Sequence, residues 1–125
     1  MERVVITGMG IYSCIGKNLD EVKESLYEGK SGIVIDEDRV PFGYSSPLTG
    51  MVDEPNLKKQ LSRRQRLSLS EEGCYAYVAT IEALENAGIT QDYLDINEVG
   101  ILYGNDSTAK AVINSIDKIR VKKDT

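Results

Sequence analysis

The chain has 125 residues, of which 41% are hydrophobic and 28% are charged, the composition of one soluble globular domain or of a part of a larger one. Its 20 acidic and 15 basic side chains leave a net charge of −5. This charge argues against a general binder of nucleic acid or of anionic membranes, because such proteins neutralise phosphates with a basic surface. No apolar run approaches the roughly eighteen residues of a membrane-spanning helix, so we expect no membrane segment and a cytoplasmic location.

The chain contains no histidine, which removes the commonest general base, the Ser–His and Cys–His nucleophile pairs and the commonest zinc ligand. Its two cysteines, Cys14 and Cys74, lie far apart in the sequence and have no metal-ligand spacing. We therefore expect both thiols to be reduced and buried, with a role in packing and not in chemistry.

The first predicted element is a strand at residues 3–7, where Val4, Val5 and Ile6 form an apolar run without polar alternation. Such a run is typical of a parallel strand that is buried on both faces. A helix should follow, with Asn18 as its N-cap and Gly29 in a left-handed conformation after its end.

Residues 31–56 have poor periodicity and can hold only short strands such as residues 32–35. The basic residues 57–66 should include a short helix. A long helix is predicted to include residues 70–87 and to stop at Gly88; the capping-box spacing of Ser68 and Glu71 favours a start there, although the helix could also continue back through the basic residues.

Thr90 is predicted to cap a single helical turn, and residues 99–103 to form a second buried strand. A helical pattern resumes at Ala109 and extends to Ile119. Strand, helices, strand and helix describe a βαβ unit, so the expected class is α/β, with parallel core strands and helices on both faces. Two core strands are few, and we expect at least one unpaired sheet edge.

Three motifs suggest ligand sites but fail on a required residue. The sequence from Gly8 to Ser13 lacks the third glycine of a dinucleotide-binding turn. Gly29-Lys30-Ser31 resembles the end of a P-loop, but Glu24 stands at the position of its first glycine. The acidic residues 36–38 lack the spacing of a calcium loop. The arginines at 63, 64 and 66 either form an exposed helix face or contact an acidic partner.

Four blocks of the sequence occur together in the same order as in a known family: residues 4–11 with Gly16 and residues 28–33, the Arg-rich approach to the long helix, residues 83–88, and residues 99–104. The sequence therefore resembles the N-terminal part of the β-ketoacyl-acyl-carrier-protein synthases. The resemblance implies that residues 1–125 are the first part of one half of a thiolase-like fold, incomplete and ending before the catalytic cysteine. The family's nucleophilic Cys, two His and Lys have no counterpart here, so no catalytic residue is expected in this chain.

For an intact protein, the resemblance implies a decarboxylative Claisen condensation of a malonyl thioester with an acyl thioester in fatty-acid synthesis. It implies acyl carrier protein as partner, which the arginines could contact, a homodimer, and no cofactor, metal or nucleic acid. Ser107 is the one candidate for substrate binding, because residues 105–108 stand where the family has a Gly/Ser-rich turn near its acyl pocket; the same hydroxyl serves equally well as a helix N-cap. The alternatives are a non-catalytic binding or structural module and, third, a nucleotide-binding βαβ domain.

Overall fold

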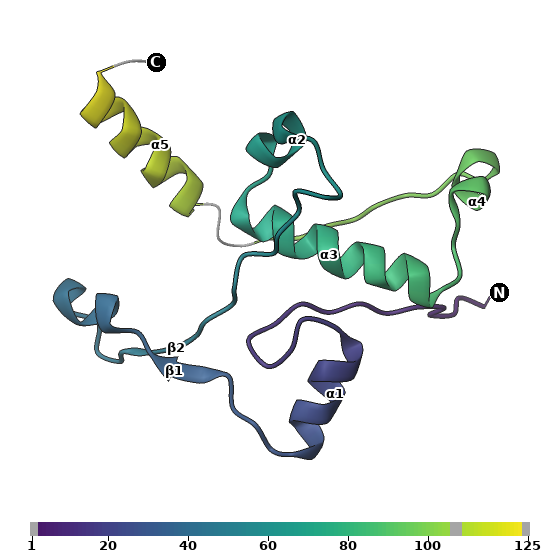
Figure 1. Ribbon diagram of the computed structural model, residues 1–125, viewed down its shortest axis with the longest axis horizontal. Coiled ribbons are helices and arrows are strands. Elements are labelled where there is room, and N and C mark those ends of the chain that lie inside the picture. The colour runs from purple at the N-terminus through teal and green to yellow at the C-terminus, as the bar shows by residue number, and fades with distance from the viewer. Residues whose placement is uncertain (1–2, 106–108, 124–125) are drawn as a thin grey trace.

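The computed structural model describes residues 3–105 and 109–123 and shows an open arrangement of elements in which the longest helix lies at the centre (Figure 1). In chain order, the elements of these residues are α1 Leu19–Tyr27, β1 Ile33–Ile35, the 3₁₀ helix η1 Glu37–Phe42, β2 Leu48–Gly50, α2 Arg63–Ser68, α3 Glu71–Asn86, α4 Gln91–Ile96 and α5 Ala109–Lys122.

Four of the predicted helix boundaries that depend on caps are confirmed. The Asn18 side chain accepts a hydrogen bond from the backbone N–H of Glu21 and so satisfies a donor in the first turn of α1. The Thr90 side chain caps α4 in the same way. Gly29 and Gly88, which follow α1 and α3, have positive φ angles of 65° and 69°, the left-handed conformation that ends a helix.

The predicted start of the long helix at Ser68 is wrong by a few residues. Ser70 is the N-cap of α3, and Glu71 is the first residue of that helix. The capping box belongs instead to α2, where Ser62 and Gln65 each bond the other's backbone N–H. Arg63, Arg64 and Arg66 therefore lie on a separate short helix and do not extend α3.

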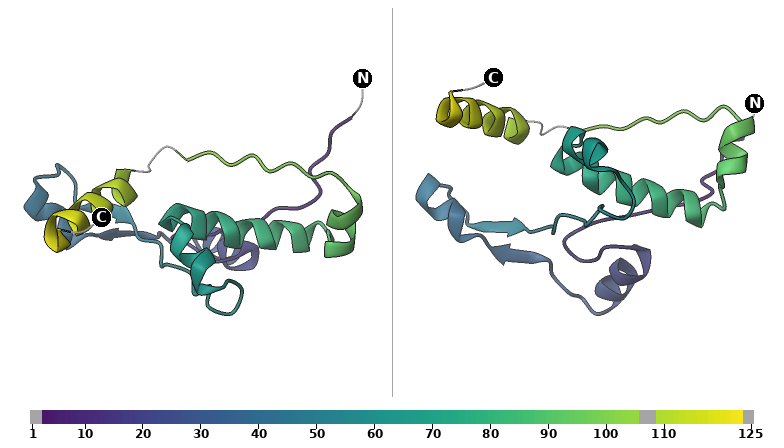
Figure 2. Two further views of the ribbon diagram at one scale, coloured as in Figure 1. Left: turned by 90° about the horizontal axis from the view of Figure 1, so that it is seen from above. Right: turned by 45° about the horizontal axis from the view of Figure 1, so that its top comes forward.

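The short strand predicted at residues 32–35 is confirmed, and it belongs to an antiparallel hairpin. Ile33 of β1 pairs with Gly50 of β2, and Ile35 pairs with Leu48. This two-stranded sheet is the one sheet that the described residues form. Figure 2 shows that the hairpin and η1 extend away from α3.

The two buried parallel strands predicted at residues 3–7 and 99–103 are not present in the structure. Both segments are extended and run in the same direction, opposite to α3, but neither pairs in a sheet (Figure 1). Their side chains are exposed, with 73% of Val5 and 102% of Leu102 accessible. A parallel strand needs a hydrogen-bonded neighbour and a cover on each face, and the described part of the chain supplies neither to these two segments. The predicted parallel core is therefore not formed by these residues.

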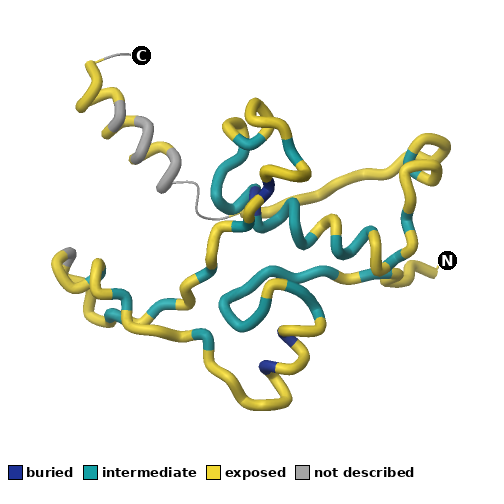
Figure 3. Tube along the Cα trace, viewed as in Figure 1, coloured by how far each residue is buried: buried dark blue, intermediate teal, exposed yellow. Residues whose placement is uncertain are grey.

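The core is correspondingly small. Among the described residues, the buried ones are Val22 and Ser25 of α1, Leu57, and Cys74 of α3 (Figure 3). The Ser25 hydroxyl donates to the carbonyl oxygen of Ile15 at 2.6 Å, so its burial leaves no polar group without a partner. Most large apolar side chains in the described residues remain accessible to water.

The N-terminal segment packs on α3 through glycines. An ideal Cβ atom on Gly10 would lie 2.7 Å from the backbone nitrogen of Ala83, and one on Gly8 would lie 2.7 Å from the Cβ atom of Ala87. Ala79, Ala83 and Ala87 are spaced by four residues and form a stripe of small side chains on one face of α3. The two glycines let the backbone lie directly on this stripe, which is a requirement for close approach and not for a turn.

Candidate binding surface

Residues 58–66 have the highest net charge of any nine-residue segment of the sequence, and all of their charged residues are basic. Five of the chain's 15 basic side chains lie within these nine residues, and no acidic residue occurs between Pro55 and Ser70. These basic residues are Lys58, Lys59, Arg63, Arg64 and Arg66, and all except the half-buried Arg66 are exposed. We call them the basic α2 surface.

The positions of two of these arginines do not stabilise their helix. Arg63 and Arg64 occupy the first turn of α2, where no acidic residue is present. The positive end of a helix dipole lies at its N-terminus and favours acidic side chains there. No ion pair in the described residues involves either arginine. Among the described residues, these two positive charges are therefore compensated neither by an ion pair nor by the helix dipole.

Arg66 is held in place by the chain around it. Its guanidinium group donates to the carbonyl oxygen of Leu61 at 2.6 Å. It also lines a surface cavity of about 310 Å³, together with residues 54–58. Leu57 lies at this cavity and is only 4% exposed. The cavity therefore has basic side chains next to an apolar one. The acidic residue that also lines it, Glu54, is not predicted from the sequence, because no local pattern links Glu54 to α2.

Neither cysteine is arranged as a nucleophile. Cys74 is buried, and burial, together with the nearby carboxylates of Glu54 and Glu71, raises the pKa of its thiol. Its predicted packing role agrees with this environment. Cys14 is half-buried, so the prediction that it is buried holds only in part; both thiols are free.

Tyr75 is another titratable group of α3 with an altered environment. Its hydroxyl donates to the Glu71 carboxylate at 2.8 Å and lies 3.2 Å from the carbonyl oxygen of Val52. Burial raises the pKa of Tyr75, and the hydrogen bond to Glu71 raises it further. The Tyr12 ring stacks on the Tyr75 ring with 5.7 Å between centroids. This phenol therefore stays protonated and acts in packing.

The predicted substrate-binding residue, Ser107, lies outside the described residues. Within residues 3–105 and 109–123, no group of three or more His, Cys, Asp or Glu side chains is placed to hold a metal ion. No helix in that part of the chain is long and apolar enough to span a membrane.

Comparison with known proteins identifies the family. Residues 1–124 match the family described as "Beta-ketoacyl synthase, N-terminal domain". The chain belongs to the β-ketoacyl synthase family. It is 36% identical, over 83% of its length, to 3-oxoacyl-[acyl-carrier-protein] synthase 1 of Haemophilus influenzae, and 34% identical, over 98%, to the protein of the same name from Buchnera aphidicola subsp. Baizongia pistaciae. The corresponding Escherichia coli K12 protein is 35% identical over 84% of the chain.

These matches confirm the family predicted from the four sequence blocks, but they cover only part of each relative. The chain spans 25% of the Haemophilus protein, 31% of the Buchnera protein and 26% of the Escherichia coli protein. As a β-ketoacyl synthase N-terminal domain it is of the thiolase-like class, although the described residues do not form the parallel core.

Proposed function

We propose that this chain is a non-catalytic N-terminal part of a 3-oxoacyl-[acyl-carrier-protein] synthase, an acyltransferase of fatty-acid synthesis. The intact enzyme would join a malonyl thioester, with loss of CO₂, to an acyl thioester on a nucleophilic Cys. The observation that supports this proposal is the family match over residues 1–124. A cytoplasmic, homodimeric enzyme that needs no cofactor is part of the same proposal.

The chain alone is proposed to be inactive. It has no histidine to stabilise developing charge, and the raised pKa of the Cys74 thiol disfavours the thiolate that attacks a thioester. Ser107 remains the proposed residue near the acyl pocket. If the purified chain condenses a malonyl thioester with an acyl thioester, both carried on acyl carrier protein, the proposal of inactivity is refuted. This activity would also exclude the second candidate, a binding module without catalysis.

The acidic partner of the basic α2 surface is proposed to be acyl carrier protein. The exposed Arg63 and Arg64 support this, because neither an ion pair within residues 3–105 and 109–123 nor the helix dipole compensates their charge. Charged groups at the rim of an interface mainly set the association rate and its dependence on salt. Binding should therefore weaken steeply as the ionic strength rises.

The test is a titration of labelled acyl carrier protein with the R63E/R64E double variant and with a control of equal charge change, K23E/K30E. Lys23 and Lys30 are exposed residues on and just after α1. We expect R63E/R64E to weaken binding by about tenfold or more at low salt, about 1.4 kcal/mol, and the control to change it far less. Equal effects of the two double variants would show that only net charge matters and would exclude α2 as the docking surface.

A further inference from the structure

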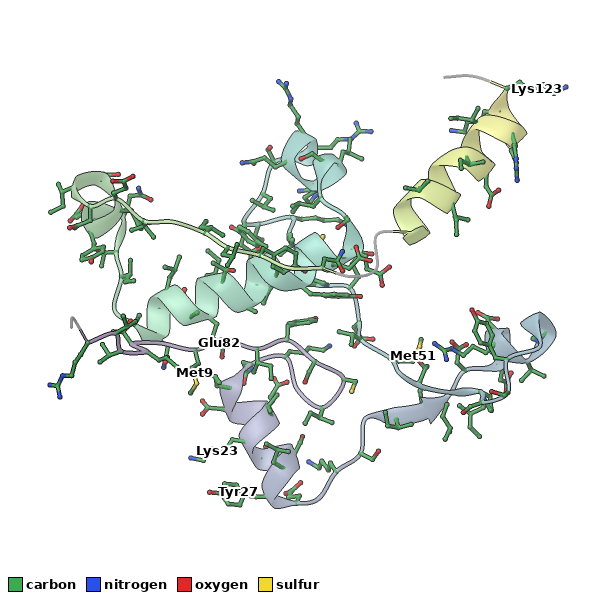
Figure 4. The ribbon with its side chains drawn as sticks, turned by 180° about the vertical axis from the view of Figure 1, so that it is seen from behind. Met9, Lys23, Tyr27, Met51, Glu82 and Lys123 are labelled. Carbon is green, nitrogen blue, oxygen red and sulfur yellow. The ribbon has the colours of Figure 1, made fainter. Side chains whose placement is uncertain are left out.

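A single carboxylate on α3 binds two separate backbone positions of the N-terminal region. One oxygen of Glu82 accepts the backbone N–H of Ile11 at 2.8 Å, and the other accepts the backbone N–H of Leu19 at 2.7 Å. Figure 4 shows Glu82 on the side of α3 that faces the N-terminal segment, close to Met9. Both contacts join residues more than sixty positions apart in the sequence.

These two bonds hold together the ends of the loop formed by residues 11–19. Leu19 is the first residue of α1, and its N–H has no acceptor within that helix. The Glu82 carboxylate supplies this acceptor, and its negative charge lies at the positive end of the α1 dipole. A loop of this length whose ends are held side by side has the form of an Ω loop, a compact surface loop packed by its own side chains.

The loop of residues 11–19 is also where three distant parts of the chain meet. The Tyr12 ring stacks on Tyr75 of α3. Cys14 packs against the backbone at Gly32 and Gly50, the residues at the base of the β1–β2 hairpin; an ideal Cβ on Gly50 would lie only 3.1 Å from its sulfur. The ammonium group of Lys17 bonds the Asp53 carboxylate at 2.8 Å, in the segment that follows β2.

We infer that Glu82 is the positioning residue of this loop and, through the loop, of the β1–β2 hairpin relative to α3. The carboxylate fixes both loop ends, and the hairpin contacts the loop through Cys14. One turn further along α3, Asn86 accepts the backbone N–H of Met9 at 3.1 Å. This second contact keeps the N-terminal segment on the helix when Glu82 is replaced, so loss of Glu82 should release the loop alone. This inference goes beyond the proposed enzymatic function and does not depend on it.

The test uses the two cysteines as reporters in the full chain carrying Glu82→Ala or Glu82→Gln. Glutamine keeps one acceptor oxygen but turns an NH₂ group toward the other backbone N–H. Glu85→Gln, on an exposed position of the same helix, is the matched control. In the unsubstituted chain, Cys74 should react with iodoacetamide more slowly than Cys14, because Cys74 is buried and its thiol pKa is raised.

We expect the Cys14 labelling rate to rise at least tenfold in Glu82→Ala, and by a smaller factor in Glu82→Gln, while the Cys74 rate stays unchanged. Unchanged rates at both cysteines would overturn the inference. A parallel rise at both would also overturn it, because that result shows general unfolding and no specific effect on the loop.

A spectroscopic signature separates a direct carboxylate contact from a structural role. In two-dimensional NMR spectra, the amide resonances of Ile11 and Leu19 should both move in Glu82→Ala and should both stay in place in Glu85→Gln. A change at only one of the two amides in Glu82→Ala would show that they do not share one carboxylate.

Discussion

Replacing Gly10 by alanine should destabilise the chain, because the new methyl group meets the backbone of α3. The added Cβ would lie 2.7 Å from the nitrogen of Ala83 and 3.0 Å from the carbonyl carbon of Ala79, and it would clash with the Ala79 oxygen. These are helix backbone atoms, which cannot rotate away as the end of a flexible side chain can. The N-terminal segment must therefore move off α3.

The loss in the free energy of unfolding depends on which contacts are strained when the N-terminal segment moves off α3. Overpacking costs about 1–3 kcal/mol. Complete loss of the hydrogen bond from the Ile11 N–H to the Glu82 carboxylate would add about 1.5–3 kcal/mol. Partial relaxation lowers the sum, so we expect a loss of about 2–4 kcal/mol in the free energy of unfolding. With a urea dependence of about 2 kcal/mol per molar, the unfolding midpoint should fall by about 1–2 M.

Gly100→Ala is the matched control for this prediction. A Cβ atom on Gly100 would meet no atom within 4 Å, and its φ angle is not in the left-handed region. Alanine there restricts the unfolded chain and should stabilise the protein by about 0.4–1 kcal/mol. Urea unfolding followed by circular dichroism at 222 nm measures both variants. If Gly10→Ala and Gly100→Ala shift the midpoint equally, the close packing of residues 8–10 on α3 is refuted.

Two further predictions concern Tyr75. Tyr75→Phe should lower the free energy of unfolding by about 1–2 kcal/mol in the same assay, because it removes the hydroxyl that bonds the Glu71 carboxylate; an unchanged midpoint would contradict this contact. Because the pKa of Tyr75 is raised in the folded chain, the folded state holds this proton more tightly than the unfolded state, so stability should fall as the pH rises above about 10. Urea midpoints measured between pH 8 and 11 should show this fall in the unsubstituted chain and a shallower one in Tyr75→Phe.

The sequence is sufficient to predict features that depend on neighbouring residues. A helix N-cap needs one side chain and a backbone N–H two or three residues away, which is why the predictions for Asn18 and Thr90 are correct. The same holds for Gly29 and Gly88, since a left-handed residue after a helix is a local requirement. The predicted start of α3 is misplaced because Ser62, Ser68 and Ser70 all offer a hydroxyl, and the spacing does not decide which of them caps.

Features that depend on distant partners are not predictable in the same way. The apolar runs at residues 3–7 and 99–103 indicate a need for burial, but the pattern does not name the strands that would pair with them. The close approach of Gly8 and Gly10 to α3 is not predicted from the sequence, although the spacing of the alanines in α3 is a signal that a backbone could lie against that helix. Glu82 gives no signal, because an acidic residue on an amphipathic helix is usually solvated.

Two kinds of surface in this chain oppose its own stability, and the proposed function would account for both. Arginines at the N-terminus of α2 are disfavoured by the helix dipole, and exposed valine, isoleucine and leucine side chains on residues 3–7 and 99–103 are disfavoured by water. Neither surface is compensated by contacts among the described residues. A carrier-protein contact would explain the first, and pairing with further strands of a thiolase-like sheet would explain the second. The loop that Glu82 holds closed is separated from the first of these apolar segments only by residues 8–10, so it would fix where such a strand ends while its neighbours pair with it.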